Sequence, residues 1–252
     1  MLINIRMIQP HIKIDKISET VLLPGDPDRI DKILAFLKNN KEIQYNREYR
    51  ISSGFYDGIK IALLSTGMGC PAAAIAVEEL ANVGAKNLIR IGTCGGLLKE
   101  MQPGDIIIPD SAFCGDGTSK EYGYGEKIIQ ADKKVVNTLI ECAKKSGVRY
   151  FVGTNRTHDA FYEPLENFIA LEGKGLISSE MECSAVFLVS KLRKLSAGAI
   201  LVVNTPEPPE EVKKNPDMIY TLIDKTKVDE GMKNAIKIAL NAAKLLESKG
   251  FS

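Results

Sequence analysis

Short apolar runs alternate along this chain with longer segments in which apolar residues recur at helical spacing. The short runs are rich in β-branched residues, as the buried strands of a parallel sheet are. They predict strands at residues 20–23, 49–56, 60–66, 87–91, 105–109, 150–155 and 197–203. Asp57-Gly58 separates the second run from the third and is a hairpin signal, so these two strands should be antiparallel neighbours.

The longer segments predict helices at residues 28–37, 71–83, 133–146, 179–192 and 228–249. The last one carries a one-sided apolar stripe suited to covering a sheet, formed by Ile236, Ala239, Leu240, Ala243 and Leu246. Residues 205–216 hold four prolines among acids and lysines, which predicts an exposed flap without regular structure. The pattern as a whole predicts a single α/β domain over residues 1–252, with a mixed sheet flanked by helices.

Composition narrows the class of protein. Hydrophobic residues make up 44% and charged residues 26% of the 252, as in a soluble globular protein. The formal net charge of +1 gives no general attraction for nucleic acid or anionic membranes, so neither is expected as a partner. No apolar run approaches the roughly 20 residues that cross a bilayer, and the start lacks a secretory signal, so we expect a cytoplasmic protein.

Cysteine and histidine usage argues against a metal site or a disulfide framework. The five cysteines are an odd number, widely spaced, with no pair two residues apart, so reduced thiols are expected. The two histidines, His11 and His158, lie far apart in sequence, which makes a histidine-rich metal centre improbable.

Arg90 is the most informative residue, because it interrupts the apolar run Leu88-Ile89-Arg90-Ile91. A guanidinium in a buried strand needs an anion, which is either an internal carboxylate or a bound ligand. The strand is followed by Gly92-Thr93-Cys94-Gly95-Gly96, which predicts a glycine-rich turn. Its backbone N–H groups and the Thr93 hydroxyl could bind phosphate oxygens.

A second strand end carries a glycine and an arginine as well. Leu23-Pro24-Gly25-Asp26-Pro27-Asp28-Arg29 leaves the first strand for a helix expected to start at Pro27, with Asp26 as its cap. The helix amides and Arg29 could face the same anion as Arg90. Two such strand ends favour a phosphate pocket over an internal salt bridge.

Two familiar motifs are weaker. Gly67-Met68-Gly69-Cys70-Pro71-Ala72 fits the dinucleotide fingerprint, but the next strand ends in Ile91-Gly92-Thr93 without the acid that would bind ribose. Residues 92–96 also fit a G-x-C-x-G nucleophile elbow at Cys94, for which His158-Asp159 would supply the base. A buried structural cysteine is favoured there.

The segment 178–184 has two interpretations. Ser179 and Glu182 have capping-box spacing at the start of a helix. Glu182 beside Met181 also suits a ribose, because a carboxylate accepts hydrogen bonds from two vicinal hydroxyls while the thioether packs on the sugar.

Together these motifs resemble the hexameric type of the nucleoside phosphorylase family, which includes uridine, purine nucleoside and methylthioadenosine phosphorylases. The resemblance rests on seven segments in order along nearly the whole chain: 10–12, 24–29, 46–49, 66–69, 90–93, 159–162 and 180–182. It implies a central sheet that is partly closed and barrel-like. It also implies a homo-oligomer built from dimers, with a hexamer expected, whose active sites are shared between subunits.

The resemblance implies roles for particular residues. Phosphate would be held by Gly25, Arg29, Arg90 and Thr93, together with Arg47 from a neighbouring subunit. Ribose would be held by Met68, Met181 and Glu182, with the neighbour's His11 at the 5′-hydroxyl, and Phe161 would pack on the base. The catalytic residues would be Arg90, Glu182 and Arg29, with inorganic phosphate as co-substrate and neither a cofactor nor a metal.

The base-binding positions depart from the family pattern. The strand ends Val202-Val203-Asn204-Thr205, without the aspartate of purine-cleaving relatives. Uridine-specific relatives carry an arginine at the position of Thr205, and a glutamine and an arginine near the positions of Leu165 and Asn167. Asn204, Thr205, Leu165 and Phe161 are therefore the candidate base contacts. Uridine is the favoured substrate, with a purine nucleoside as the alternative, and a non-catalytic nucleoside-binding protein or a cysteine hydrolase as alternatives of another class.

Overall fold

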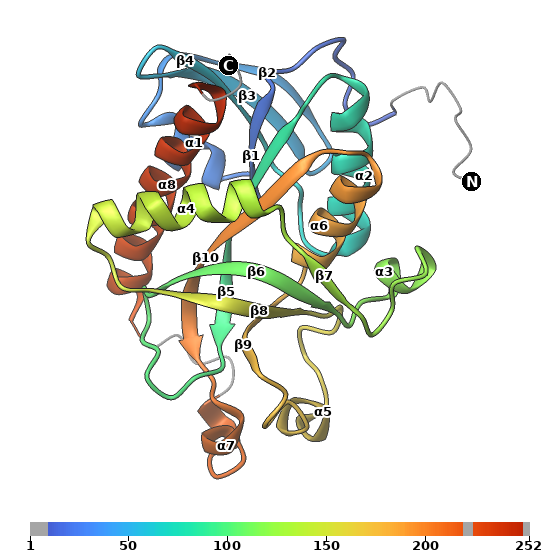
Figure 1. The fold of residues 1–252 in the computed structure, drawn as a ribbon, viewed down its shortest axis with the longest axis vertical. Helices are drawn as coiled ribbons and strands as arrows, with labels where there is room; N and C mark the ends of the chain where they lie inside the picture. Colours follow the sequence, from blue (N-terminus) through green and yellow to red (C-terminus); the bar gives the residue numbers. More distant parts are fainter. Residues whose placement is uncertain (1–9, 219–223, 249–252) are drawn as a thin grey trace.

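The computed structural model describes residues 10–218 and 224–248, which form a mixed sheet flanked by helices (Figure 1). Its strands are β1 (Thr20–Pro24), β2 (Lys38–Asn46), β3 (Tyr49–Tyr56), β4 (Ile59–Leu64), β5 (Asn87–Gly96), β6 (Ile106–Cys114), β7 (Ile128–Gln130), β8 (Tyr150–Thr157), β9 (Leu176–Glu180) and β10 (Ser196–Pro206). All seven predicted strands are present. The hairpin between β3 and β4 is confirmed, with positive φ at Asp57 (47°) and Gly58 (84°).

The sheet closes on itself through β5. Its order is β10-β6-β8-β9-β5-β1-β4-β3-β2, and β10 also pairs with β5, so five strands form a ring: β5, β9, β8, β6 and β10. The other main strands extend from β5, and β7 pairs with β6 at the side. This confirms the expected mixed sheet with a closed, barrel-like part.

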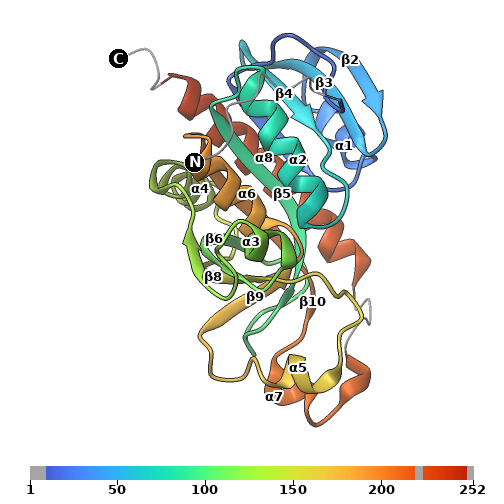
Figure 2. The same ribbon diagram turned by 90° about the vertical axis from the view of Figure 1, so that its right-hand side faces the viewer.

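Helices flank the sheet in two groups (Figures 1 and 2). α4 (Lys133–Ser146) packs against α8 (Lys225–Ser248), and α2 (Cys70–Asn82) packs against α6 (Cys183–Leu192) beside α3 (Gly117–Glu121). The predicted apolar stripe of α8 is confirmed, because all five of its residues are at most 1% exposed. None of the helices within the described residues combines the length and apolar character needed to cross a membrane.

Two short helices lie together at one end of the molecule. α5 (Leu165–Ile169) and α7 (Pro209–Val212) are in contact below the barrel (Figure 2). The remaining helical elements are α1 (Arg29–Leu34) and the 3-10 turn η1 (Pro216–Met218).

The prediction of an irregular flap at 205–216 is wrong. β10 continues to Pro206, and α7 follows with Pro209 in its first turn, where the missing N–H costs nothing. Val212 is fully buried against Leu97 and Phe168, so this segment has a small core of its own.

The helix expected from Ser179 begins later, because residues up to Glu180 belong to β9. α6 starts at Cys183, and the capping box of Ser179 and Glu182 is not formed. The Glu180 carboxylate accepts the N–H groups of Glu182 (2.9 Å) and Cys183 (3.1 Å) in its place. Pairing of Ser179 with Gly95 and Arg156 holds the chain extended up to that point.

The glycine-rich segment 92–96 is also strand rather than turn. β5 pairs with β10 as far as Gly96 and Pro206, so backbone amides of this segment are engaged in the sheet. The polar strand β2 was not predicted, because seven of its nine residues are exposed and it carries no apolar alternation.

Candidate active site

Strand ends from both halves of the sheet surround a cavity of about 720 Å³. Ten of the thirteen predicted site residues line it: Gly25, Arg29, Met68, Arg90, Thr93, Phe161, Met181, Glu182, Asn204 and Thr205. The closed ring and the β1–β4 extension thus bring residues from six segments to one place.

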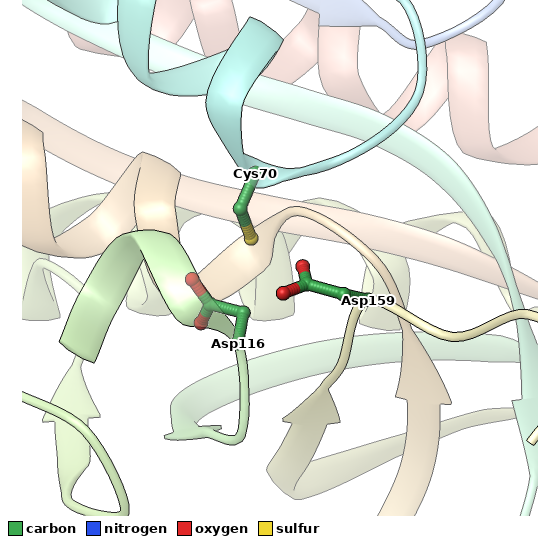
Figure 3. A group of neighbouring side chains, drawn as sticks. All are labelled: Cys70, Asp116 and Asp159. Carbon is green, nitrogen blue, oxygen red and sulfur yellow. The ribbon is translucent and has the colours of Figure 1, made fainter. Parts of the chain in front are cut away.

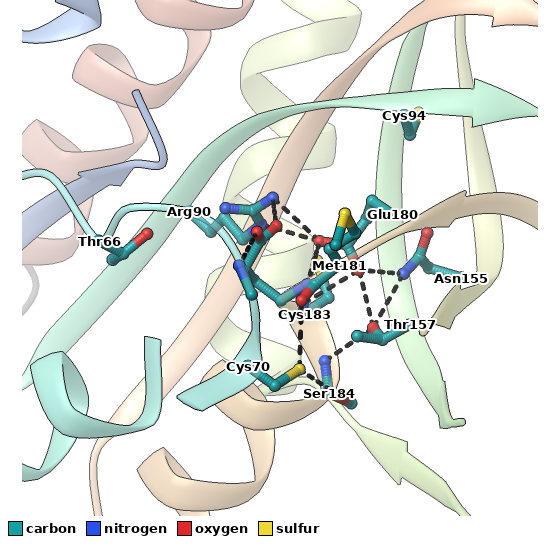
Figure 4. A network of polar contacts seen from close by, with 12 residues as sticks. Thr66, Cys70, Arg90, Cys94, Asn155, Thr157, Glu180, Met181, Cys183 and Ser184 are labelled. Atoms are coloured by element: carbon teal, nitrogen blue, oxygen red, sulfur yellow. Dashed lines mark hydrogen bonds and ion pairs between the residues drawn. The ribbon is translucent and has the colours of Figure 1, made fainter. Parts of the chain in front are cut away.

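Arg90 is bound by two internal acids and also lines the cavity. Figure 4 shows Arg90 beside Glu180. Its side chain is 4% exposed; Nε donates to Oε2 of Glu180 at 3.0 Å, and Nη2 contacts Glu182. Nη1 has no hydrogen-bond partner within residues 10–218 and 224–248. The internal salt bridge, which the sequence disfavoured, is therefore present, and one guanidinium nitrogen remains for a ligand.

The two acids respond differently to this shared arginine. Burial opposes ionisation of Glu180, but Arg90 and hydrogen bonds from Thr157 and two backbone amides outweigh it, so the pKa of Glu180 is lowered. Burial raises the pKa of Glu182, and Glu180 adds to this against the opposing effect of Arg90. Burial also disfavours charge on Arg90, but Glu182 and Glu180 raise its pKa above the ordinary value. Arg90 is a permanent cation that holds Glu180 ionised.

Glu180 is the centre of a buried polar network (Figure 4). Its Oε1 accepts hydrogen bonds from Thr157 Oγ1 at 2.7 Å and Asn155 Nδ2 at 2.8 Å. Thr157 Oγ1 in turn accepts the N–H of Ser184 at 3.0 Å. Strands β8 and β9 and the start of α6 are tied together in this way, which fixes the backbone that carries Glu182.

Glu182 joins the two halves of the cavity wall. Its Oε1 accepts the N–H of Gly69 at 2.7 Å, at the start of α2. In a dinucleotide site this amide would bind pyrophosphate, but here it donates to the Glu182 carboxylate. Met68 beside it is 84% exposed, and Met181 also lines the cavity. The dinucleotide interpretation is therefore wrong, whereas two thioethers do flank Glu182.

Arg29 lies beside Arg90 at the end of the cavity that β1 approaches. Its Nη1 donates to the carbonyl of Ile91 at 3.0 Å. Burial lowers the pKa of Arg29, and the positive charge of Arg90 adds to this. Asp26 accepts the N–H of Asp28 at 2.9 Å and is not a helix cap, because α1 begins two residues later than predicted, at Arg29.

The opposite end of the cavity is formed by β10 and the 158–168 segment. Asn204 is the extra residue in a bulge of β10, since Val203 pairs with Cys94 and Thr205 with Gly95. Bulges re-aim a side chain, and Asn204 lines the cavity.

Aromatic side chains border the same end. Phe161 packs edge-on against Tyr162, with ring centroids 5.0 Å apart, and both line the cavity. Leu165, a predicted base contact, does not line it, because it packs against the small cluster that includes Leu97 and Val212. Phe168, one turn of α5 further along, lines the cavity in its place.

His11 and Arg47 lie away from the cavity of their own chain but close to each other. Nδ2 of Asn46 donates to the carbonyl of His11 at 3.0 Å. His11 Nδ1 is 2.7 Å from Oε1 of Glu79, and Arg47 is exposed with a φ of 56°. The two residues predicted to serve a neighbouring subunit therefore share one surface, and their role stays a prediction.

Glu180, His158, Glu163 and Glu207 also line the cavity, and none of them was among the residues predicted to bind phosphate, ribose or base. Arg156 holds Glu163 through two bonds of 2.6 and 2.8 Å. Burial lowers the pKa of His158, as does the nearby charge of Arg156. Glu180 belongs to the segment 180–182 on which the family resemblance rests, so that motif could have identified it. Glu207 lies in the proline-rich segment that was predicted to be an exposed flap, so no signal in the sequence pointed to it.

Cys94 is unsuited to nucleophilic catalysis. It lies inside β5 rather than at a strand-to-helix turn, and burial raises the pKa of its thiol well above the ordinary value. All five cysteines are buried free thiols. The nucleophile elbow is therefore not formed.

One group of side chains has metal-ligand types at close range: Cys70, Asp116 and Asp159 (Figure 3). Asp116 accepts hydrogen bonds from Ser119 N (2.7 Å) and Ser184 Oγ (2.5 Å), and Asp159 accepts one from Gly117 N (2.8 Å). Burial raises the pKa of the Cys70 thiol. Cys70 Sγ, at the start of α2, lies 3.5 Å from Ser184 Oγ, so the group has a structural role in joining α2, α3 and α6.

Known proteins resemble this chain along most of its length. The family model of the phosphorylase superfamily matches residues 19–248. A guanosine phosphorylase from Halorubrum lacusprofundi is 35% identical over 241 residues, which cover 94% of this chain and 99% of the relative. A uridine phosphorylase from Thermococcus kodakarensis is 36% identical over 212 residues, covering 78% and 76% respectively.

Solved structures agree with the fold. The purine nucleoside phosphorylase from Toxoplasma gondii in complex with immucillin-H superposes with a TM-score of 0.86 at 31% identity, covering 96% of this chain and 97% of that one. The uridine phosphorylase from Vibrio fischeri gives a TM-score of 0.83 at 30% identity, covering 96% and 99%. The chain belongs to the phosphorylase superfamily, in which its relatives are nucleoside phosphorylases.

Proposed function

We propose that this chain is a pentosyltransferase that cleaves ribonucleosides with inorganic phosphate, releasing the free base and ribose 1-phosphate. The observation that carries the proposal is the free Nη1 of Arg90, which lies beside Arg29 and Gly25 in the same cavity as Glu182. A Cβ on Gly25 would come into contact with this nitrogen, at 3.7 Å, so Gly25 lies directly beside it.

Phosphate would bind at the end of the cavity formed by Gly25, Arg29, Arg90 and Thr93. The guanidinium groups supply positive charge and the Thr93 hydroxyl a further hydrogen bond. The reaction would need neither a metal nor an organic cofactor, since the arginine side chains bind the anionic phosphate.

Ribose would bind between phosphate and base, against Met68, Met181 and Glu182. As the base leaves, the C1′ carbon becomes oxocarbenium-like, and the phosphate dianion both stabilises this charge and attacks the carbon. The C1′–N bond breaks with its electron pair going to the base, and the C1′–O bond to phosphate forms. The proton of the hydrogen phosphate passes, directly or through water, to the departing base. Glu182 accepts hydrogen bonds from the sugar hydroxyls and holds them in place.

The charge balance of the cavity supports a contribution from a second subunit. Within one chain, Arg29 and Arg90 are matched by Glu180 and Glu182, so a bound dianion leaves this end of the cavity negative. An added cation would correct this, and Arg47 of a neighbouring subunit would supply it in a homo-oligomer built from dimers, as a hexamer is. His11, on the same surface, would then reach the 5′-hydroxyl.

The predicted base contacts would suit more than one class of base. Asn204 can donate to and accept from a pyrimidine or a 6-oxopurine, and Phe161 can stack on either. Uridine, which the sequence favours, and purine nucleosides are both represented among the relatives. The five free cysteines suit the reducing cytoplasm.

A nucleoside panel incubated with and without phosphate tests the proposal. The free base should appear in chromatography only when phosphate is present, together with an equal amount of ribose 1-phosphate. Release of base without phosphate would favour a hydrolase, and binding without release would favour a nucleoside-binding protein. Either result would refute the phosphorylase.

A further inference from the structure

Glu207 places a carboxylate at the base end of the cavity, in a position that the substrate roles above do not use. It follows β10 directly and lines the cavity with Asn204 and Thr205. Its backbone N–H donates to the carbonyl of Gly96 at 2.6 Å, and prolines 206 and 208 flank it. Since proline fixes its own φ and restricts the residue before it, the backbone of Glu207 has little freedom.

The carboxylate lies beyond the proposed phosphate contacts along β5. A Cβ on Gly95 would come 2.6 Å from Oε2 of Glu207, so the acid sits directly over this glycine. Gly95 is two residues beyond Thr93 and five beyond Arg90, which corresponds to about 7 Å and about 16 Å of extended strand. A nucleoside whose ribose lies against a phosphate at Arg90 can therefore extend its base along β5 toward Glu207.

Gly95 leaves room for this acid, as Gly92 does for the Arg90 guanidinium. Because the atom that a Cβ at position 95 would meet is the end of the Glu207 side chain, a larger residue there would displace the carboxylate rather than the sheet. The position of the carboxylate over β5 therefore depends on this glycine.

A carboxylate accepts hydrogen bonds and selects bases by their donors. Guanine presents two adjacent donors, N1–H and the 2-amino group, which match the two oxygens of one carboxylate. Hypoxanthine keeps only N1–H of this pair. Uracil presents a single N3–H between two carbonyl oxygens, both of which would face the negative charge.

We infer that Glu207 recognises the N1–H and 2-amino edge of a guanine-type base, which makes 2-amino-6-oxopurine ribonucleosides the preferred substrates. The inference rests on the proposed phosphorolysis and goes against the uridine preference expected from sequence. Asn204, on the adjacent bulge, can donate to an acceptor of the same base, and Phe161 supplies an aromatic face.

The test measures kcat/KM for guanosine, inosine and uridine at saturating phosphate. The wild-type enzyme should prefer guanosine to inosine by about 10- to 100-fold, the range of one hydrogen bond to a charged group. Glu207→Gln should lose most of this preference, because an amide offers one acceptor and a donor that opposes the 2-amino group. Glu210→Gln is the matched control: Glu210 lies in α7, outside the cavity, and pairs with Lys99 at 2.8 Å on the surface.

The outcomes separate the two proposals. Phosphate-dependent cleavage with uridine or inosine used as well as guanosine would overturn the base assignment and leave the phosphorylase standing. So would a guanosine preference that Glu207→Gln leaves intact. If no nucleoside is cleaved with phosphate, the proposed function fails and the base assignment with it. Should Glu207→Gln not fold, a wild-type guanosine-to-inosine ratio near one would still overturn the base assignment.

Discussion

Nε of Arg90 donates to Oε2 of Glu180 over 3.0 Å, although the two residues are 90 positions apart and both side chains are at most 4% exposed. A buried ion pair of this kind is expensive to form, but removing one partner costs more, because the other charge is left without compensation. The same arginine must also meet the substrate anion in the proposed reaction. Structure and chemistry therefore depend on one guanidinium.

Arg90→Ala should impair folding as well as turnover. Its loss leaves Glu180 and Glu182 buried together, and we expect the free energy of unfolding to fall by about 3–5 kcal/mol. Urea denaturation measures the difference, with Arg50→Ala as the control, since Arg50 pairs with the exposed Asp31 and Glu42. An Arg90→Ala protein as stable as the wild type would contradict the role of the pair.

Glu182→Gln should separate catalysis from folding more cleanly. The amide oxygen can still accept the N–H of Gly69, but the acceptor of the sugar hydroxyls loses its charge. We expect kcat/KM for phosphorolysis to fall by about 10²- to 10³-fold, the range for losing one electrostatic stabiliser. The melting temperature should fall less than in Arg90→Ala, because Arg90 stays paired with Glu180. Full activity in this variant would remove Glu182 from the mechanism.

His158 should make stability depend on pH just below neutrality. Its pKa is lowered in the folded state, so as the pH falls below about 6.5 the unfolded chain takes up a proton first. The contribution of neutral His158 to the free energy of unfolding is therefore complete above that pH, and it is lost as the pH falls toward the pKa of the folded state. The free energy of unfolding, measured from pH 7.5 to 5.5, should decline more steeply for the wild type than for His158→Asn. Equal slopes would show that His158 titrates alike in both states.

The cluster of Cys70, Asp116 and Asp159 should behave as a hydrogen-bonding group. Addition of a chelator should leave phosphorolysis and the melting temperature unchanged. Asp116→Ala removes acceptors for Ser119 N and the buried Ser184 hydroxyl, which should cost about 1–3 kcal/mol of stability. A chelator-induced loss of stability that added metal restores would instead establish a metal site.

Arg47→Ala should lower activity without changing the fold, because Arg47 is exposed in the single chain. The proposed donation to a neighbouring subunit can be tested by mixing Arg47→Ala and Glu182→Gln subunits after dissociation. Mixed oligomers should regain part of the activity, since some sites then receive both wild-type residues. No recovery, in oligomers shown by mass spectrometry to be mixed, would place Arg47 outside the shared site.

The sequence pattern predicted most of the fold, because the burial of a strand or helix is reflected in the spacing of its own apolar residues. The β-branched runs located all seven predicted strands, and Asp57-Gly58 located the hairpin, since each depends on residues that are neighbours in the chain. Pattern failed at β2, which is mostly exposed, and at Ser179, where pairing with Gly95 overrides a good local capping signal.

The sequence by itself determined that a charge at position 90 lies inside a buried strand and needs an anion. Tertiary structure alone decided that Glu180 and Glu182 are this anion for two of its nitrogens, leaving Nη1 for a ligand. It also brought Glu207 over Gly95, more than 100 positions away in the chain. The reason is physical: local composition shows that a buried group needs a partner, but strand register and sheet closure determine which residue reaches it.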